Sequence, residues 1–289
     1  MRSGNKQASK NTMEQARERV RNWQSGLLDL SDLGLTELPE LPAGLTEFYC
    51  HRNKLTRLPD TLPATLTKLV CSMNQLTTLP DTLPAGLREL NCACNQLTTL
   101  PDTLPASLEE LYCRDNQLLS LPDTLPAGIT SLFCAKNRLT RLPDTLPASL
   151  EELYCRDNQL LSLPDTLPAG LAELYCDNNQ LTSLPLTLPA GLEALNCTIN
   201  QLSTLPDPLP ATLIVFNCYL NLLPENEENE SMHDYIARVK AIADAKAEAE
   251  SKERIVARCA LYFEELAKKV WHPQRVERRM LAGVDMEDM

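Results

Sequence analysis

A period of 21 residues constrains this chain more than any other feature of its sequence. Cysteine recurs at that spacing in nine places, and asparagine recurs three residues after each of those cysteines. The cysteines are Cys50, Cys71, Cys92, Cys113, Cys134, Cys155, Cys176, Cys197 and Cys218. A sequence that repeats in phase so many times predicts a solenoid, in which each repeat forms one coil and contacts only its neighbours.

The letters of one repeat predict the structure of one coil. Each repeat follows the pattern L-x-x-L-x-C-x-x-N-x-L, as in Leu108–Leu118, which is the leucine-rich-repeat template with Cys in place of one Leu. Leu111 and Cys113 alternate with Tyr112, so we expect a short strand with the first two side chains inward and Tyr112 outward. Two prolines in residues 121–126 remove amide donors and fix φ, so the return path is predicted to run extended.

The extent of the repeat divides the chain into three parts. Residues 26–224 form the predicted array of about ten coils of 20–21 residues. Residues 1–25 hold a basic tail and a capping helix, expected to begin at a capping box on Thr12 and to lay Trp23 over the first coil. Residues 225–289 hold an acidic linker and a helical segment. The predicted fold class is an α/β repeat, a solenoid with a parallel concave β-sheet and a non-helical convex side.

Two apolar stripes in the C-terminal part, beginning at Met232 and Ile255, predict two helices. On one straight helix the stripes would lie nearly opposite each other, so we predict a break near residues 247–251. The second helix is expected to end at His272, and a short third helix is expected to follow. This segment is predicted either to pack on the last coil, where Phe216 would otherwise face water, or to form a separate domain.

Charge, hydropathy and cysteine content exclude several classes of protein. Residues 26–224 carry 10 basic and 22 acidic side chains, and an acidic body repels phosphate backbones, so no nucleic-acid partner is expected. The sequence contains neither an apolar run of about 18 residues nor an apolar segment near its start, so it predicts no membrane span and no secretory signal peptide. Eleven cysteines without such a signal indicate a reducing compartment, and the expected localisation is cytoplasmic, in a bacterium, a virus-infected cell or an injected host cell.

No motif in the sequence carries catalytic or metal-binding chemistry. The three histidines have no ligand spacing, and phosphate-binding and serine-nucleophile motifs are missing. The cysteine column could form a metal or disulfide ladder, but a buried free cysteine also packs well as a small hydrophobe, which is the interpretation we favour. A column of aspartates after proline could hold calcium, but it lacks the glycine-rich turns of calcium solenoids. We therefore predict no enzyme, cofactor, metal or small-molecule substrate, and one exposed thiol, Cys94.

The outward strand positions carry the variation that a binding surface requires. A central aromatic column flanked by acids and arginines is typical of protein-binding faces, because Tyr and Arg dominate hot spots. Alternatively, the aromatic side chains stack across strands and only stabilise the sheet, and both interpretations can hold together. Residues 100–128 and 142–170 are identical, which predicts two equal surfaces. The predicted protein-binding residues are Tyr49, Glu110, Tyr112, Arg114, Phe133, Glu152, Tyr154, Arg156 and Tyr175.

The unit L-P-A-G-L-x-x-L-x-C-x-x-N-x-L-T-x-L-P resembles the LPX-type repeats of bacterial effectors, such as Yersinia outer protein M and the invasion plasmid antigen H ubiquitin ligases. Ala16–Trp23 and Leu28–Pro39 are similar to the helix and first repeat of that group. The resemblance covers about residues 13–224 and implies a protein-binding scaffold or effector acting on host proteins. The alternative is the substrate-recognition part of a ligase-type effector, although the ligase domain is missing. The Cys-x-Asp nucleophile motif of the ligase domain has the same letters as the segments that begin at Cys113 and Cys155. Both of these cysteines are predicted to face the core.

Overall fold

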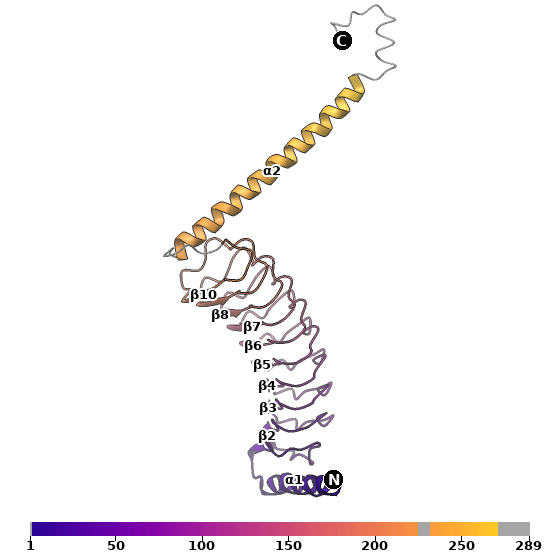
Figure 1. The fold of residues 1–289 in the computed structure, drawn as a ribbon. Coiled ribbons are helices and arrows are strands. Elements are labelled where there is room, and N and C mark those ends of the chain that lie inside the picture. Colours follow the sequence, from indigo (N-terminus) through magenta and orange to yellow (C-terminus); the bar gives the residue numbers. More distant parts are fainter. Residues whose placement is uncertain (1, 225–231, 271–289) are drawn as a thin grey trace, which may run out of the picture. The chain divides into compact units, whose positions relative to one another are not determined.

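Ten parallel strands form one continuous sheet along the repeat array. The computed structural model describes residues 2–224 and 232–270, and the strands follow one another in sequence order along the concave side of the coils (Figure 1). The strands are β1 (Gly26–Asp29), β2 (Leu45–Tyr49), β3 (Lys68–Val70), β4 (Glu89–Asn91), β5 (Glu110–Tyr112), β6 (Ser131–Phe133), β7 (Glu152–Tyr154), β8 (Glu173–Tyr175), β9 (Ala194–Asn196) and β10 (Val215–Asn217). The predicted solenoid is thus confirmed.

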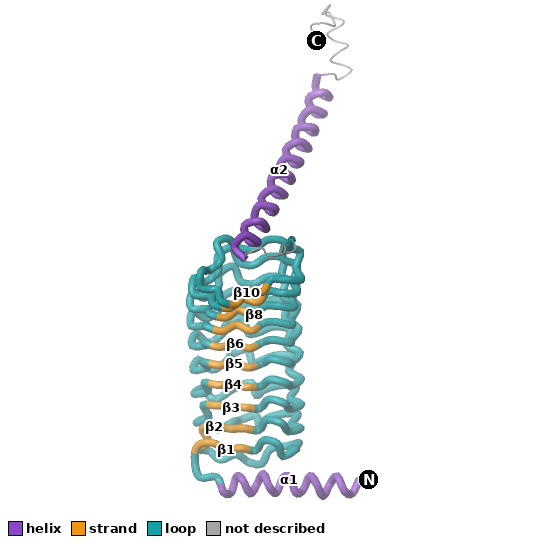
Figure 2. Tube along the Cα trace, turned by 60° about the vertical axis from the view of Figure 1, so that its left-hand side comes forward, coloured by secondary structure: helices purple, strands orange, loops and turns teal. Residues whose placement is uncertain are grey.

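The core of the array consists of leucine and cysteine columns. Leu111 and Cys113 are fully buried while Tyr112 between them is half-buried, as the alternation predicts. Leu118 is also fully buried and Leu121 is 5 % exposed, so both close the coil from the convex side. The connections between strands contain turns and extended segments but no helix within residues 26–224 (Figure 2). Because each coil is hydrogen-bonded to its neighbours, every inward position forms a continuous column.

The asparagine column joins successive coils through backbone groups. In Asn158 the side-chain Nδ2 donates to the carbonyl oxygens of Cys134 at 3.1 Å and Cys155 at 3.0 Å. Its Oδ1 accepts the backbone N–H of Leu139 at 3.0 Å. One buried amide thus satisfies groups from two coils where the chain leaves the strand, and the same pattern recurs from Asn53 to Asn221. The structural role predicted for this column is confirmed.

The N-terminal helix α1 (Arg2–Asn22) begins earlier than the sequence predicts. The expectation that it starts after Thr12 was wrong, because nothing upstream terminates a helix: residues 2–11 contain no proline. Ala16 on this helix is fully buried. A Cβ placed on Gly44 would lie 3.7 Å from the Trp23 ring, so the indole covers the end of the first coil, as predicted.

The C-terminal helix α2 (Met232–Val270) is one uninterrupted helix of 39 residues. The predicted break near residues 247–251 is wrong, because this region is rich in Ala, Glu and Lys and carries a Glu248–Lys252 ion pair of 2.8 Å one turn apart. Ile255, with which the second apolar stripe begins, is 59 % exposed on this single helix. The predicted helix end at His272 and the third helix lie outside the described residues, and packing on the last coil stays a prediction. Neither α1 nor α2, as described, is long and apolar enough to cross a membrane.

Candidate protein-binding face

Four aromatic side chains form a continuous stack on the outward face of strands β5 to β8. The rings of Tyr112 and Phe133 lie 4.8 Å apart between centroids and are inclined by 18°. Phe133 and Tyr154 follow at 4.5 Å and 15°, and Tyr154 and Tyr175 at 4.6 Å and 8°. The parallel register places these residues directly opposite one another, and the strand spacing of about 4.8 Å brings the rings into contact. The cross-strand stacking considered from the sequence is therefore present.

The tyrosine hydroxyls hold the neighbouring carboxylates in place. Tyr112 donates to Glu110 of its own strand at 2.8 Å, whereas Tyr154 donates to Glu173 of the next strand. Tyr112 cannot make the corresponding contact with the next strand. The residue of β6 that is equivalent to Glu173 is Ser131, which has no carboxylate. Burial raises the pKa of both phenols above its ordinary value, and the adjacent carboxylates raise it further. Both tyrosines therefore stay protonated donors.

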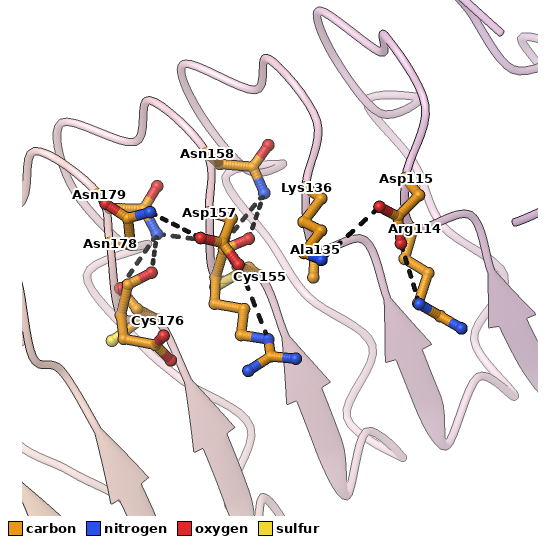
Figure 3. A network of polar contacts seen from close by, with 12 residues as sticks. Arg114, Asp115, Ala135, Lys136, Cys155, Asp157, Asn158, Cys176, Asn178 and Asn179 are labelled. Carbon is orange, nitrogen blue, oxygen red and sulfur yellow. Dashed lines mark hydrogen bonds and ion pairs between the residues drawn. The ribbon is translucent and has the colours of Figure 1, made fainter. Parts of the chain in front are cut away.

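Arginines on the opposite side of the aromatic stack are neutralised by aspartates. Arg114 lies 2.9 Å from Asp115, and Lys136 approaches the same carboxylate at 3.9 Å. Arg156 lies 3.9 Å from Asp157, which also accepts a hydrogen bond of 2.6 Å from Asn178. Figure 3 shows two such links between neighbouring coils, one from Lys136 to Asp115 and one from Asn178 to Asp157. The predicted arginines thus flank the aromatic stack as expected, but with their charge compensated.

The aspartates of this network were not among the residues that the sequence singled out. Asp115 and Asp157 occupy the position before each column asparagine, where the backbone adopts φ of 55°. Asp and Asn tolerate this left-handed conformation better than most residues, so their recurrence at one repeat position was a usable signal.

In the next coil one carboxylate oxygen of Asp177 is buried without a hydrogen-bond partner among the described residues, and burial raises the pKa of this carboxyl group.

Tyr49 lies on the same face but apart from the aromatic stack. Val70 and Asn91 occupy the two intervening positions of its column, so no ring bridges β2 to β5. Its ring lies 6.2 Å from that of His51 between centroids, and Lys68 lies over it at 5.7 Å. The structure thus brings eight of the nine predicted residues together and leaves Tyr49 at one end of the array.

The cysteines of the array are free thiols with two different environments. All nine column cysteines are buried, and burial raises the pKa of Cys92, Cys134 and Cys176 to about 12. Cys94 is partly exposed. Its thiol pKa is raised by partial burial and by Asp115. Within the described residues no group of three or more His, Cys, Asp or Glu side chains could hold a metal ion.

Thiol labelling at pH 8 should separate these two environments. We expect Cys94 to react with a maleimide at least about a hundred-fold faster than any column cysteine, because labelling requires an accessible thiolate. The measurement is native-state labelling read by mass spectrometry. It uses a Cys259→Ser background, which removes the one cysteine outside residues 26–224, so that the fast phase reports on Cys94. A Cys94→Ser variant should lose that phase. Fast labelling of several column cysteines would contradict the buried arrangement.

Comparison with known proteins identifies similar repeat arrays. No protein-family model and no curated protein matches the chain. A solved Shigella effector leucine-rich-repeat domain is 34% identical, and the match covers 59% of this chain and 78% of that chain at a TM-score of 0.50. YopM from Yersinia enterocolitica is 34% identical over 66% of this chain at a TM-score of 0.46, and this chain spans only 50% of it. The leucine-rich-repeat array of FLRT2, solved in complex with Latrophilin 3 and Unc5D, is 27% identical over 68% of this chain and 67% of that chain, at a TM-score of 0.59.

Proposed function

Because this chain belongs to the leucine-rich-repeat family, with a repeat region like those of bacterial effectors, we propose that it is a non-enzymatic scaffold that binds another protein through its concave face. We further propose that it acts as an effector on host proteins in the cytoplasm. The FLRT2 array, which shares the fold, was solved within a multiprotein complex, and that supports a binding role for such an array.

The aromatic stack is the observation that carries this proposal. Its four rings are half-buried, so each presents an edge to solvent on a surface with no covering element within residues 2–224. Stacking and hydroxyl–carboxylate hydrogen bonds hold the side chains in one arrangement before a partner arrives. A surface that is already ordered loses little conformational entropy on binding, which favours affinity. Rigid tyrosines flanked by polar groups are also the composition of binding hot spots.

Alanine substitution of Tyr112 and Tyr154 tests the proposal. The full chain serves as bait in host-cell lysates, and a captured partner is then titrated against the purified variants. Each substitution should weaken binding by about 2 kcal/mol, roughly thirty-fold in Kd, because it removes a ring from the centre of the face. The fold should persist, since both side chains lie outside the leucine core.

Two exposed aspartates on the other side of the same coils provide the control. Asp102→Ala and Asp144→Ala change residues of the two identical segments and should alter Kd less than about two-fold. If these changes abolish binding while the tyrosine changes do not, the concave face is not the binding site.

The second candidate function is the substrate-recognition part of a ubiquitin-ligase-type effector. It rests on the resemblance of the repeat unit to the LPX-type repeats of such ligases. A ubiquitin-charging assay distinguishes the two candidates, with Cys259→Ala as its control. A thioester that forms on the wild-type chain and is lost in the variant would replace the scaffold proposal by an enzyme.

A further inference from the structure

We infer that the concave face accepts a basic segment of its partner in the polyproline II conformation, in which two positively charged side chains about 9 Å apart contact Glu110 and Glu152. This inference rests on the proposed function and specifies the chemistry of the partner. Three features of the face carry it, namely an uncompensated column of carboxylates, the fixed orientation of those carboxylates, and the distance between two identical coils.

The two sides of the aromatic stack differ in net charge. On the arginine side, Arg114 and Lys136 share Asp115 and Arg156 lies 3.9 Å from Asp157, so each positive charge has an aspartate beside it. The opposite side carries a column with a glutamate at the first position of β4, β5, β7 and β8, and with Ser131 and Ala194 at that position of β6 and β9. Of these glutamates, Glu89 has a cationic neighbour, Lys68. The other three glutamates of this column, Glu110, Glu152 and Glu173, have no ion pair among the described residues.

The uncompensated carboxylates beside the stack can accept more hydrogen bonds than they receive within the chain. Glu110 accepts one hydrogen bond from Tyr112, and a carboxylate has room for several more donors. Because the Tyr154 hydroxyl turns to Glu173, Glu152 has no side-chain partner among the described residues. A guanidinium or ammonium group arriving from a partner would supply the missing donors and charge, and the salt-bridged arginine side offers no equivalent site.

The spacing of the two carboxylates selects the conformation of the ligand. Glu110 and Glu152 belong to identical segments two coils apart, and the ring steps between those coils are 4.8 and 4.5 Å. In polyproline II, residues i and i+3 lie on one side of the helix about 9 Å apart, which matches two coils. An extended strand puts residues i and i+2 about 7 Å apart on one side, and an α-helix puts i and i+7 about 10.5 Å apart. The polyproline II spacing fits these two coils best.

The aromatic stack favours arginine-bearing ligands with apolar stems. Within the stack, the faces of Phe133 and Tyr154 are covered by neighbouring rings, so a ligand meets mainly ring edges. The methylene groups of a long basic side chain can pack along those edges while its charged end reaches the glutamate column. A short acidic or purely apolar segment would bury a carboxylate without supplying a donor, which costs free energy.

Synthetic peptides test the inference without knowledge of the natural partner. A proline-rich peptide with arginines at i and i+3 is compared with one of the same composition that has them at i and i+2, by fluorescence anisotropy in about 50 mM and about 150 mM salt. The full chain should bind the i, i+3 peptide at least about ten-fold more tightly. The double variant Glu110→Gln/Glu152→Gln should lose at least about ten-fold of that affinity.

Asp102→Asn/Asp144→Asn is the matched control, since it removes the same charge from the same two segments on the other side of the coils. It should change Kd less than about two-fold at the higher salt concentration. An equal loss in this variant, or equal affinity for the two peptides, would overturn the inference in favour of general attraction to an acidic protein. If the tyrosine variants lose the captured partner while the glutamine variants keep it, the proposed function stands and the basic-segment inference fails.

Discussion

Replacing Asn158 by alanine should lower the free energy of unfolding by about 3 kcal/mol. The substitution removes an Oδ1 acceptor from the backbone N–H of Leu139 and an Nδ2 donor from the carbonyl oxygens of Cys134 and Cys155. Asn158 is buried, so water does not replace the hydrogen bonds that the substitution removes. The Leu139 N–H is left without a partner, which costs about 1–3 kcal/mol for a buried polar group. The carbonyl oxygens of Cys134 and Cys155 each lose one of two amide donors and keep those of Asn137 and Asn179.

The adjacent amide Gln159 supplies the control for this experiment. Its side chain is exposed, and its backbone N–H donates to the carbonyl oxygen of Leu139 in wild type and variant alike. Gln159→Ala should therefore change stability by less than about 0.5 kcal/mol. Chemical denaturation followed by circular dichroism measures both variants. Equal midpoints for Asn158→Ala and wild type would show that the asparagine column does not hold the coils together.

Alkaline pH should unfold the array at a pH where ordinary proteins of this size remain folded. Burial keeps the column thiols protonated in the folded chain, with a pKa of about 12 for Cys134 and Cys176, whereas an unfolded thiol ionises near 9.0. Unfolding therefore releases protons above pH 9, and the stability that is intact below this pH is lost as the pH rises toward the folded pKa. At pH 10 the loss is roughly 1–2 kcal/mol for each thiol whose pKa is raised to about 12, and burial raises the pKa of the other column thiols in the same direction. Several such thiols together remove a large part of the stability of a domain.

A double variant separates the thiol contribution from that of other groups. Cys113→Val/Cys134→Val keeps two fully buried positions apolar at nearly constant volume and removes two ionisable groups. Between pH 8 and pH 10, under reducing conditions, this variant should lose about 3 kcal/mol less stability than the wild type. Urea denaturation at each pH measures the difference. Identical pH profiles for the two proteins would mean that the column thiols do not govern alkaline unfolding.

The spacing of the repeat accounts for the parts of the structure that were predicted correctly. The alternation of Leu111, Tyr112 and Cys113 predicted which side chains face the core, because a strand has a strict period of two. The phase of the asparagine column predicted its structural role, because a buried amide beside a turn must bond to backbone groups. The extents of the helices were predicted less well. The earlier start of α1 and the continuity of α2 follow from helix propensity over polar stretches, which the search for apolar stripes ignored.

The sequence by itself therefore determined the solenoid, its inward columns and the outward face, since all of these depend on local period and on side chains of one coil. Only the tertiary structure decided how that face is organised. Tyr112 donates to Glu110 while the identical Tyr154 donates to Glu173, and this difference depends on whether the next coil carries Ser131 or a glutamate. The physical reason is that the partners of an outward side chain lie about 4.8 Å away on a neighbouring strand, 21 residues distant in sequence. Identical coils thus acquire different hydrogen bonds and different free carboxylates from their neighbours.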